Sequence, residues 1–170
     1  MGKFQILNTN KYIVVNTYND QLRIHVREYA RYGDRFYPTP KGVFFNPSTF
    51  ATLVLHADEI TKALEEIESG HAMDFKVHLG CGIFCTISHD YTFVNLRKFF
   101  PSPLNGKLLP TTKGICLQKK EWIAVKSLFE NIKSISSEIA SASPCFFADG
   151  HNNLSGCPTC YPYGEDISYV

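Results

Sequence analysis

The chain has 170 residues, 44% of them apolar, and a formal net charge of +1 at neutral pH. No apolar run approaches the roughly 20 residues of a membrane-spanning helix, and Met1 to Phe4 do not begin the apolar run of a secretion signal. These features exclude a transmembrane protein, so we expect no membrane partner. Six scattered cysteines without such a signal indicate a reducing, intracellular compartment. We expect the nucleus if the protein is eukaryotic or comes from a virus of a eukaryotic host.

One pattern occurs twice in the chain, about 70 residues apart. Each copy begins with two β-rich segments, continues through an Arg-x-aromatic step, and reaches Pro-Thr-x-Lys-Gly before a long helical segment. The duplication predicts two copies of one small fold. The expected units are a first repeat at residues 1–70, a second repeat at residues 71–140 and a Cys/Gly/Pro-rich tail at residues 141–170.

Alternating residues predict antiparallel strands in both copies. Leu22, Ile24 and Val26 would face inward, with charged residues between them facing outward. Hairpin turns are expected at Asn19-Asp20 and His89-Asp90. Short final strands should follow the Pro-Thr-x-Lys-Gly loops, at residues 42–45 and 114–117. In the second copy the inward residues would be Thr92, Val94 and Leu96.

Each copy is expected to end in one long amphipathic helix, which makes the fold α+β. Asn46-Pro47 is a good start signal for the first helix, and Gln118-Lys119 is a poorer one for the second. Apolar residues recur at steps of three and four, so each helix has one apolar stripe, and we predict that the two stripes pack on each other. The corresponding positions are Phe50, Leu53, Ala57, Ile60, Leu64 and Ile67, and Trp122, Val125, Phe129, Ile132, Ser136 and Ile139.

Short motifs in both copies point to one known family. They are Phe4 to Ile6, Lys11 to Val15, Val26 to Tyr29, Lys41-Gly42 and Asn46 to Phe50, and then Phe75, Arg97, Gly106-Lys107, Pro110, Lys113 to Ile115 and Glu121-Trp122. These residues resemble the single-stranded-DNA-binding domain of transcriptional coactivator positive cofactor four, over roughly residues 4 to 140. The resemblance implies a curved four-stranded sheet and one helix per copy. The copies would pair through their helices as an intramolecular pseudo-dimer that holds single-stranded or melted DNA.

Positive charge is concentrated on the two predicted sheets. Residues 1–46 carry seven Lys/Arg against three Asp/Glu, and residues 75–118 carry five against one, so each sheet region has a balance of +4. Residues 47–69, in the first helix, have a balance of −4. Binding to phosphates needs a local positive field rather than a basic protein. The alternative interpretation of these charges is an ordinary solvated strand face.

Aromatic residues lie among these charges, a combination suited to an unpaired strand because its bases stack on aromatic rings. The resemblance implies binding roles for Tyr18 in the hairpin, for Arg27 and Arg97 at strand ends, and for Lys41 and Lys113 in the loops. Structural packing is the alternative role for each aromatic residue. The full set of candidate residues is Lys11, Tyr18, Arg23, Arg27 and Lys41 in the first copy, and Tyr91, Phe93, Arg97, Lys98, Lys107 and Lys113 in the second.

The tail contains a possible zinc site. Cys157 and Cys160 have the Cys-x-x-Cys spacing, and Cys145 and His151 could complete a set of four ligands. The alternative is a tail with reduced cysteines and no metal, and we expect no other cofactor. Three further cysteines in predicted strands, Cys81, Cys85 and Cys116, are interpreted as small core residues.

The sequence contains no Gly-rich phosphate loop, paired metal carboxylates or nucleophile motif, so we expect no enzymatic activity. The leading interpretation is a binder of single-stranded DNA or RNA in transcription or replication, with transcription or replication proteins as further partners. Two alternatives remain open: a protein–protein scaffold that kept the fold without the DNA surface, and a small zinc-binding adaptor. Higher assembly into a homo-oligomer is left open.

Overall fold

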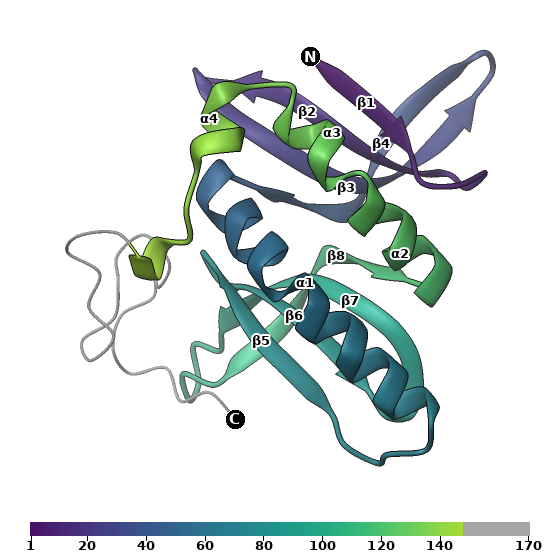
Figure 1. Ribbon diagram of the computed structural model, residues 1–170, viewed down its shortest axis with the longest axis vertical. Coiled ribbons are helices and arrows are strands. Elements are labelled where there is room, and N and C mark those ends of the chain that lie inside the picture. The colour runs from purple at the N-terminus through teal and green to yellow at the C-terminus, as the bar shows by residue number, and fades with distance from the viewer. Residues whose placement is uncertain (148–170) are drawn as a thin grey trace.

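Each half of the chain forms one four-stranded antiparallel sheet in the computed structural model, which describes residues 1–147 (Figure 1). Within each sheet the strands pair in chain order. The first sheet contains β1 (Gly2–Gln5), β2 (Lys11–Tyr18), β3 (Gln21–Tyr32) and β4 (Arg35–Phe45), and the second contains β5 (Phe75–Gly80), β6 (Ile83–Ser88), β7 (Tyr91–Pro101) and β8 (Leu108–Leu117). The predicted α+β class with two sheet units is confirmed.

The predicted alternation of strand residues holds with one exception. Leu22, Ile24 and Val26 are buried in β3, and Val94 and Leu96 are buried in β7. Asn19 and Asp20 have positive φ angles of 50° and 61°, as both central residues of a type I′ hairpin turn require. The exception is Thr92, which is exposed because it lies beside the hairpin turn at the start of β7 rather than over the core.

The two Pro-Thr-x-Lys-Gly segments lie inside β4 and β8, so the prediction of loops followed by short strands is wrong. Both strands form an outer edge of their sheet, where a proline without an N–H group is tolerated. Each segment is opposite a register shift in the neighbouring strand, between Arg27 and Tyr29 in β3 and between Arg97 and Phe99 in β7. These two bulges lie beside Arg27 and Arg97, two residues of the candidate site.

Helix α1 (Pro47–Glu68) agrees with the prediction in its start signal and in its buried face. Asn46 caps it, accepting a hydrogen bond of 2.8 Å from the Thr49 N–H, and Pro47 takes the first helical position. All six residues of the predicted apolar stripe are buried. The 3.6-residue period therefore identified the correct face of this helix.

The second helical segment is broken into three helices, which corrects the prediction of one long helix. They are α2 (Lys119–Ser127), α3 (Phe129–Lys133) and α4 (Ser137–Ser141), followed by the 3-10 turn η1 (Cys145–Phe147). Ser136 caps α4, where its side chain accepts from the Glu138 N–H at 3.1 Å, so it is no part of an apolar stripe. Serine side chains compete with helical hydrogen bonds, and Ser134, Ser136 and Ser137 interrupt this segment.

The helices cover one side of the two sheets and contact each other, as predicted (Figure 1). The indole Nε1 of Trp122 in α2 donates a 3.0 Å hydrogen bond to the Thr61 hydroxyl of α1. The rings of Phe50 and Phe129 meet edge to face at 5.5 Å between centroids. Helix α1 also packs on β5, β6 and β7 of the second sheet, so it connects the two halves of the molecule.

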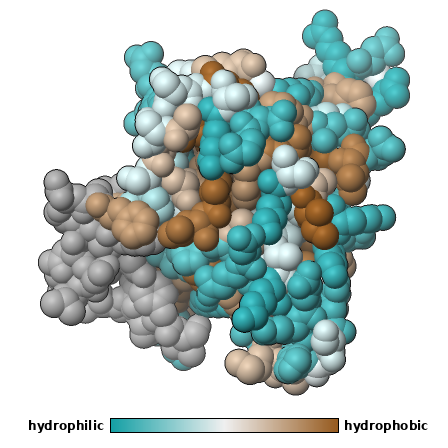
Figure 2. Space-filling model, viewed as in Figure 1, coloured by the Kyte–Doolittle hydropathy of each residue, from teal (hydrophilic) through white to brown (hydrophobic). Residues whose placement is uncertain are grey.

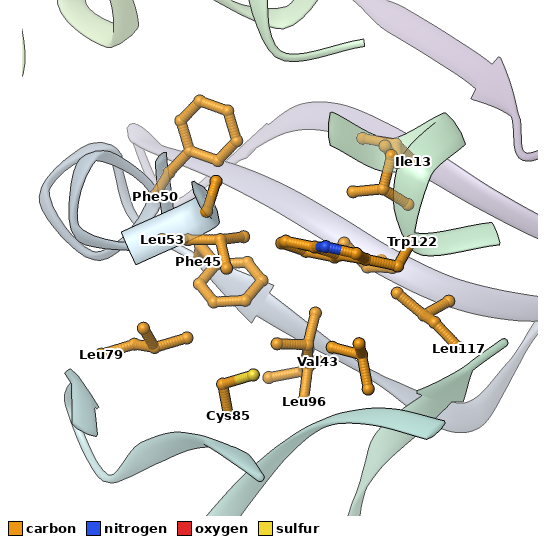
Figure 3. Close-up of a cluster of buried hydrophobic side chains, with 14 of the residues drawn as sticks. Ile13, Val43, Phe45, Phe50, Leu53, Leu79, Cys85, Leu96, Leu117 and Trp122 are labelled. Carbon is orange, nitrogen blue, oxygen red and sulfur yellow. The ribbon is translucent and has the colours of Figure 1, made fainter. Parts of the chain in front are cut away.

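One hydrophobic core extends through both halves. Figure 3 shows Ile13, Val43 and Phe45 of the first sheet in the same cluster as Leu96 of the second sheet and Trp122 of α2. Each half is small for an independent core, and burial against the other half compensates for this.

The three strand cysteines do not share the expected core role. Cys85 is fully buried, and burial raises the pKa of its thiol. Cys116 is exposed on β8, and Cys81 lies in the turn between β5 and β6 with a positive φ of 54°. The core interpretation is therefore correct for Cys85 alone among these three residues.

Some apolar surface remains exposed on the side of the molecule that carries the helices, as Figure 2 shows. Leu55 of α1 is half exposed, beside a recess of about 180 Å³ between α1 and the segment that contains α4. Among residues 1–147, no helix is long and apolar enough to cross a membrane.

Candidate nucleic-acid interface

The outward face of the first sheet carries a compact group of aromatic rings and cations, formed by Lys3, Tyr12, Arg27 and Tyr29. We call it the first cluster. The Lys3 ammonium lies 4.7 Å from the ring centroids of both Tyr12 and Tyr29, and these two rings are 5.2 Å apart, edge to face. Tyr12 pairs with Arg27 across β2 and β3. The group thus presents π faces beside positive charge.

The second sheet carries the equivalent group at the same strand positions, formed by Lys76, Phe84, Arg97 and Phe99. We call it the second cluster. The Lys76 ammonium lies 4.8 Å and 5.1 Å from the Phe84 and Phe99 ring centroids, and the two rings are 5.1 Å apart. Phe84 pairs with Arg97 as Tyr12 pairs with Arg27. Both sheets therefore bring one lysine, one arginine and two rings together.

The arginine of each cluster is held by the threonine of the Pro-Thr-x-Lys-Gly segment. The Arg27 Nη1 donates to the Thr39 carbonyl at 2.8 Å, and the Thr39 hydroxyl donates to the Glu28 carbonyl at 2.9 Å. The same pair of bonds joins Arg97 to Thr111, at 2.8 Å, and Thr111 to the Lys98 carbonyl, at 2.7 Å. These bonds use part of each guanidinium and orient the rest.

The glycine of each segment makes room for the arginine stem. A Cβ atom on Gly42 would lie 2.7–2.8 Å from Cα, Cβ and Cγ of Arg27. A Cβ atom on Gly114 would meet Arg97 at the same distances. The repeated motif is thus explained by one geometry, in which the glycine lets the guanidinium lie across the strand and the threonine fixes it.

Replacing Gly42 with alanine is expected to lower the free energy of unfolding by about 1–3 kcal/mol, because the new methyl group must displace the Arg27 stem or its backbone. Denaturant unfolding measures this loss. Lys41→Ala is the control, since Lys41 is the exposed neighbour in the same strand and should change stability by less than about 0.5 kcal/mol. Equal stabilities of the two variants would show that the arginine stem moves aside without cost.

A second cation–π group lies further along the outward face of the first sheet. The Arg23 guanidinium carbon is 4.6 Å from the Tyr18 ring centroid and 4.4 Å from that of Phe44. Within residues 1–147, its Nε is a buried side-chain nitrogen without a hydrogen-bond partner. Tyr18 is 57% exposed and Phe44 39% exposed, so both rings remain accessible to a ligand.

His25 lies between the two arginines of this face and is held neutral. Burial, and then the positive charges of Arg27 and Arg23, lower its pKa from 6.5 to about 4. Its Nε2 is 3.3 Å from the Asn16 side-chain oxygen. In the second sheet, burial and Lys76 likewise lower the pKa of His78 to about 4. Both pKa values are lowered mainly by burial, and the neighbouring cations add a smaller contribution.

Acid is expected to destabilise the protein through these two histidines. Their folded pKa values lie below 6.5, so between pH 6.5 and pH 4 the unfolded chain takes up protons that the folded chain does not. The free energy of unfolding therefore decreases as the pH is lowered through this range. The expected loss at pH 4.5 is on the order of 1 kcal/mol per histidine after allowance for solvent screening. Unfolding of the parent and of a His25→Gln, His78→Gln double variant should be compared at pH 7 and pH 4.5. The variant should lose less stability, and equal losses would contradict this account.

The other predicted binding residues fall into two groups. Lys41, Tyr91 and Lys113 are exposed, and Phe93 lies on the same face of β7 as Arg97. Lys98 and Lys113 line a cavity together with Arg27. Lys107, by contrast, lies at the far end of the β7–β8 hairpin, after the turn at Gly106, and is not part of either cluster.

Lys11 is the predicted binding residue whose side chain is engaged elsewhere. Its ammonium contacts the Glu121 carboxylate at 3.0 Å and donates to the Cys116 carbonyl at 2.9 Å. Its side chain is only 15% exposed. The structure therefore assigns Lys11 to the contact between the first sheet and the second half of the chain.

Sequence reasoning missed seven residues of these groups: Lys3, Tyr12, Tyr29 and Phe44 in the first sheet, and Lys76, Phe84 and Phe99 in the second. The alternation of Tyr12 with the inward Ile13, and of Phe44 with the inward Phe45, was a usable signal. The contacts of Lys3 and Lys76 depend on diagonal neighbours across strands, which a single sequence does not reveal.

The candidate zinc ligands His151, Cys157 and Cys160 lie outside the described residues. Cys145 begins the turn η1. Within residues 1–147, no three His, Cys, Asp or Glu side chains are grouped so as to hold a metal ion. Zinc binding by the tail thus stays a prediction, to be tested by metal analysis of the purified protein.

Residues 89–128 match the family model of the transcriptional coactivator p15 (PC4). The matched segment spans β7, β8 and α2, and it includes Arg97, Thr111 and Gly114. No curated protein and no solved structure matches the chain. The match supports the family to which the motifs of the second copy point.

Proposed function

We propose that this protein binds single-stranded or melted DNA in transcription, without catalysing a reaction, through the outward faces of its two sheets. The observation that carries the proposal is the occurrence of two equivalent clusters, each with a lysine, two rings in edge-to-face contact and an arginine held by a threonine carbonyl beside a glycine. Unpaired bases can stack on the partly exposed Tyr12 and Tyr29 rings of the first cluster while the cations contact phosphates, whereas the Phe84 and Phe99 rings of the second cluster are buried. The family match over residues 89–128 gives independent support.

We further propose that the two halves arose by duplication and act as an intramolecular pseudo-dimer. The two sheets have the same strand order and equivalent bulges, and they share one core, which supports this interpretation. Each protein molecule would then present two DNA-binding surfaces that are held in a fixed position relative to each other. Transcription or replication proteins would be further partners in a nuclear or other intracellular setting.

The test is competition for a labelled unpaired DNA oligonucleotide by unlabelled unpaired DNA, duplex DNA and RNA at two salt concentrations. We expect unpaired DNA to compete best, because duplex DNA hides the base faces that the rings would stack on. Binding should weaken as salt rises, because phosphate contacts release counterions. Equal competition by duplex DNA, or binding independent of salt, would argue against the proposal.

A protein-binding scaffold is the second candidate. Half-exposed Leu55 and the adjacent recess between α1 and the segment with α4 favour it, because apolar surface beside a hollow suits a protein contact. A chain that binds no nucleic acid in the competition assay would leave this candidate as the better one.

A further inference from the structure

A cavity of about 300 Å³ lies where β4 of the first sheet meets the second sheet. We call it the junction pocket. Its rim carries three cations, Arg27, Lys98 and Lys113, and the ring of Phe44. The rest of its lining is uncharged and includes Val43, Thr49, Ile83 and Thr112. Arg27 also lines a recess on the outward face of the first sheet, so the pocket adjoins the first cluster.

The equivalent space in the other half of the molecule is filled. Lys11 is the residue of the first sheet that corresponds to Ile83 of the second sheet. Lys11 pairs with Glu28 across β2 and β3, and Ile83 pairs with Lys98 across β6 and β7. Glu121 is the third residue of α2, as Thr49 is the third of α1.

The Lys11–Glu121 ion pair closes that space. The Lys11 ammonium donates to the carbonyl of Cys116, and Phe44 of the pocket rim is the residue of the first half that corresponds to Cys116. The Lys11–Glu121 ion pair stands in one half at the positions where Ile83 and Thr49 stand in the other half, so the two halves differ here. The two junctions between the halves therefore differ in the side chains that line them.

We infer that the junction pocket receives one base of a bound unpaired strand, an assignment that rests on the proposed function. Its volume is at the lower end of the range for small-ligand pockets, roughly 300–1,000 Å³, which suits a single base. Bases of unpaired strands can be splayed from the backbone and held between side chains. Val43 and Ile83 offer apolar contact to the base, and the Phe44 ring offers stacking.

The cations at the rim are placed for the phosphates on either side of such a base. Arg27 comes from the first sheet, and Lys98 and Lys113 come from the second. A strand that crosses from one sheet to the other would meet positive charge before and after the pocket. A base held in the junction pocket would anchor the strand at one defined position, although the two clusters are alike.

The experiment closes the pocket by copying the other half into it. The double variant Ile83→Lys, Thr49→Glu introduces the side chains of Lys11 and Glu121 at the equivalent positions and leaves the net charge unchanged. Ile123→Lys with Asn131→Glu, two exposed positions on α2 and α3, is the matched control. Both variants and the parent are titrated with unpaired DNA and with a strand of the same length that has stable abasic sugars throughout.

We expect the closed variant to bind the base-containing strand roughly 10-fold more weakly than the parent, the loss that follows from one stacked base. Its binding of the abasic strand and its salt dependence should match those of the parent, because the phosphate contacts remain. The control should match the parent with both strands. If the closed variant unfolds, Thr112→Trp replaces it, because this exposed rim residue can fill the pocket without altering the buried lining.

Two results would overturn the assignment while leaving the proposed function intact. One is a closed variant that binds the base-containing strand as tightly as the parent does. The other is equal weakening toward both strands, which would mean lost phosphate contacts rather than a lost base. A parent that binds neither strand would refute the proposed function, and the junction pocket with it.

Discussion

A double replacement of Arg27 and Arg97 by alanine is expected to weaken binding of an unpaired DNA strand by roughly 100-fold at physiological salt. Hydrogen bonds to charged groups contribute about 1.5–3 kcal/mol each, and this variant removes one guanidinium from each cluster. Loss of these charges should weaken binding for all sequences and reduce the salt dependence. Fluorescence anisotropy at several salt concentrations measures both effects.

The control for this variant removes the same charge from the helices. Lys62→Ala with Lys120→Ala replaces two exposed lysines of α1 and α2 and should leave binding almost unchanged. Thermal unfolding of each variant separates lost contacts from lost structure, because Arg27 and Arg97 also hydrogen-bond to Thr39 and Thr111. A folded double-arginine variant that binds as tightly as the parent would place the interface elsewhere and favour the scaffold.

Trp122→Ala is expected to cost about 3–5 kcal/mol of unfolding free energy, the range for deletion of a large buried aromatic side chain. Trp122 is fully buried and contacts α1 through its hydrogen bond to Thr61, so its loss opens a cavity between the helices and removes this bond. Small domains have roughly 5–15 kcal/mol of stability in total, so this loss is a large share. Equilibrium denaturation in urea measures it.

The neighbouring Ile123 provides the control, because it is 47% exposed and its replacement by alanine should change stability by no more than about 0.5 kcal/mol. The shared core also predicts a single unfolding transition for both halves. Two separate transitions in the parent would contradict the shared core, as would a small effect of Trp122→Ala.

The inequality of the two halves has a simple chemical origin. A true dimer of identical chains must place the same side chains on both sides of its axis. A single chain is free of this constraint, so Lys11 and Glu121 can fill one half while Ile83 and Thr49 leave space in the other. The proposed base pocket depends on this freedom.

Several parts of the candidate interface could be predicted from the sequence, and others could not. Arg23, Arg27 and Arg97 were predicted because alternation places them on the outward face, and Tyr18 was predicted from the family resemblance. Lys11 was misplaced, because its partner Glu121 lies 110 residues away in the sequence. The Pro-Thr-x-Lys-Gly segments lie in strands and not in the predicted loops: proline and glycine usually mark turns, whereas here they lie opposite a bulge.

The sequence by itself determined the two-part organisation, the inward strand residues and the buried face of α1, because these follow from local periods of 2 and 3.6 residues. Only the tertiary structure decided where the second helical segment breaks and which rings meet which cations. It also decided where the junction pocket opens. Each of these depends on pairing across strands and on packing between the halves, and neither is recorded in the spacing of residues along one chain.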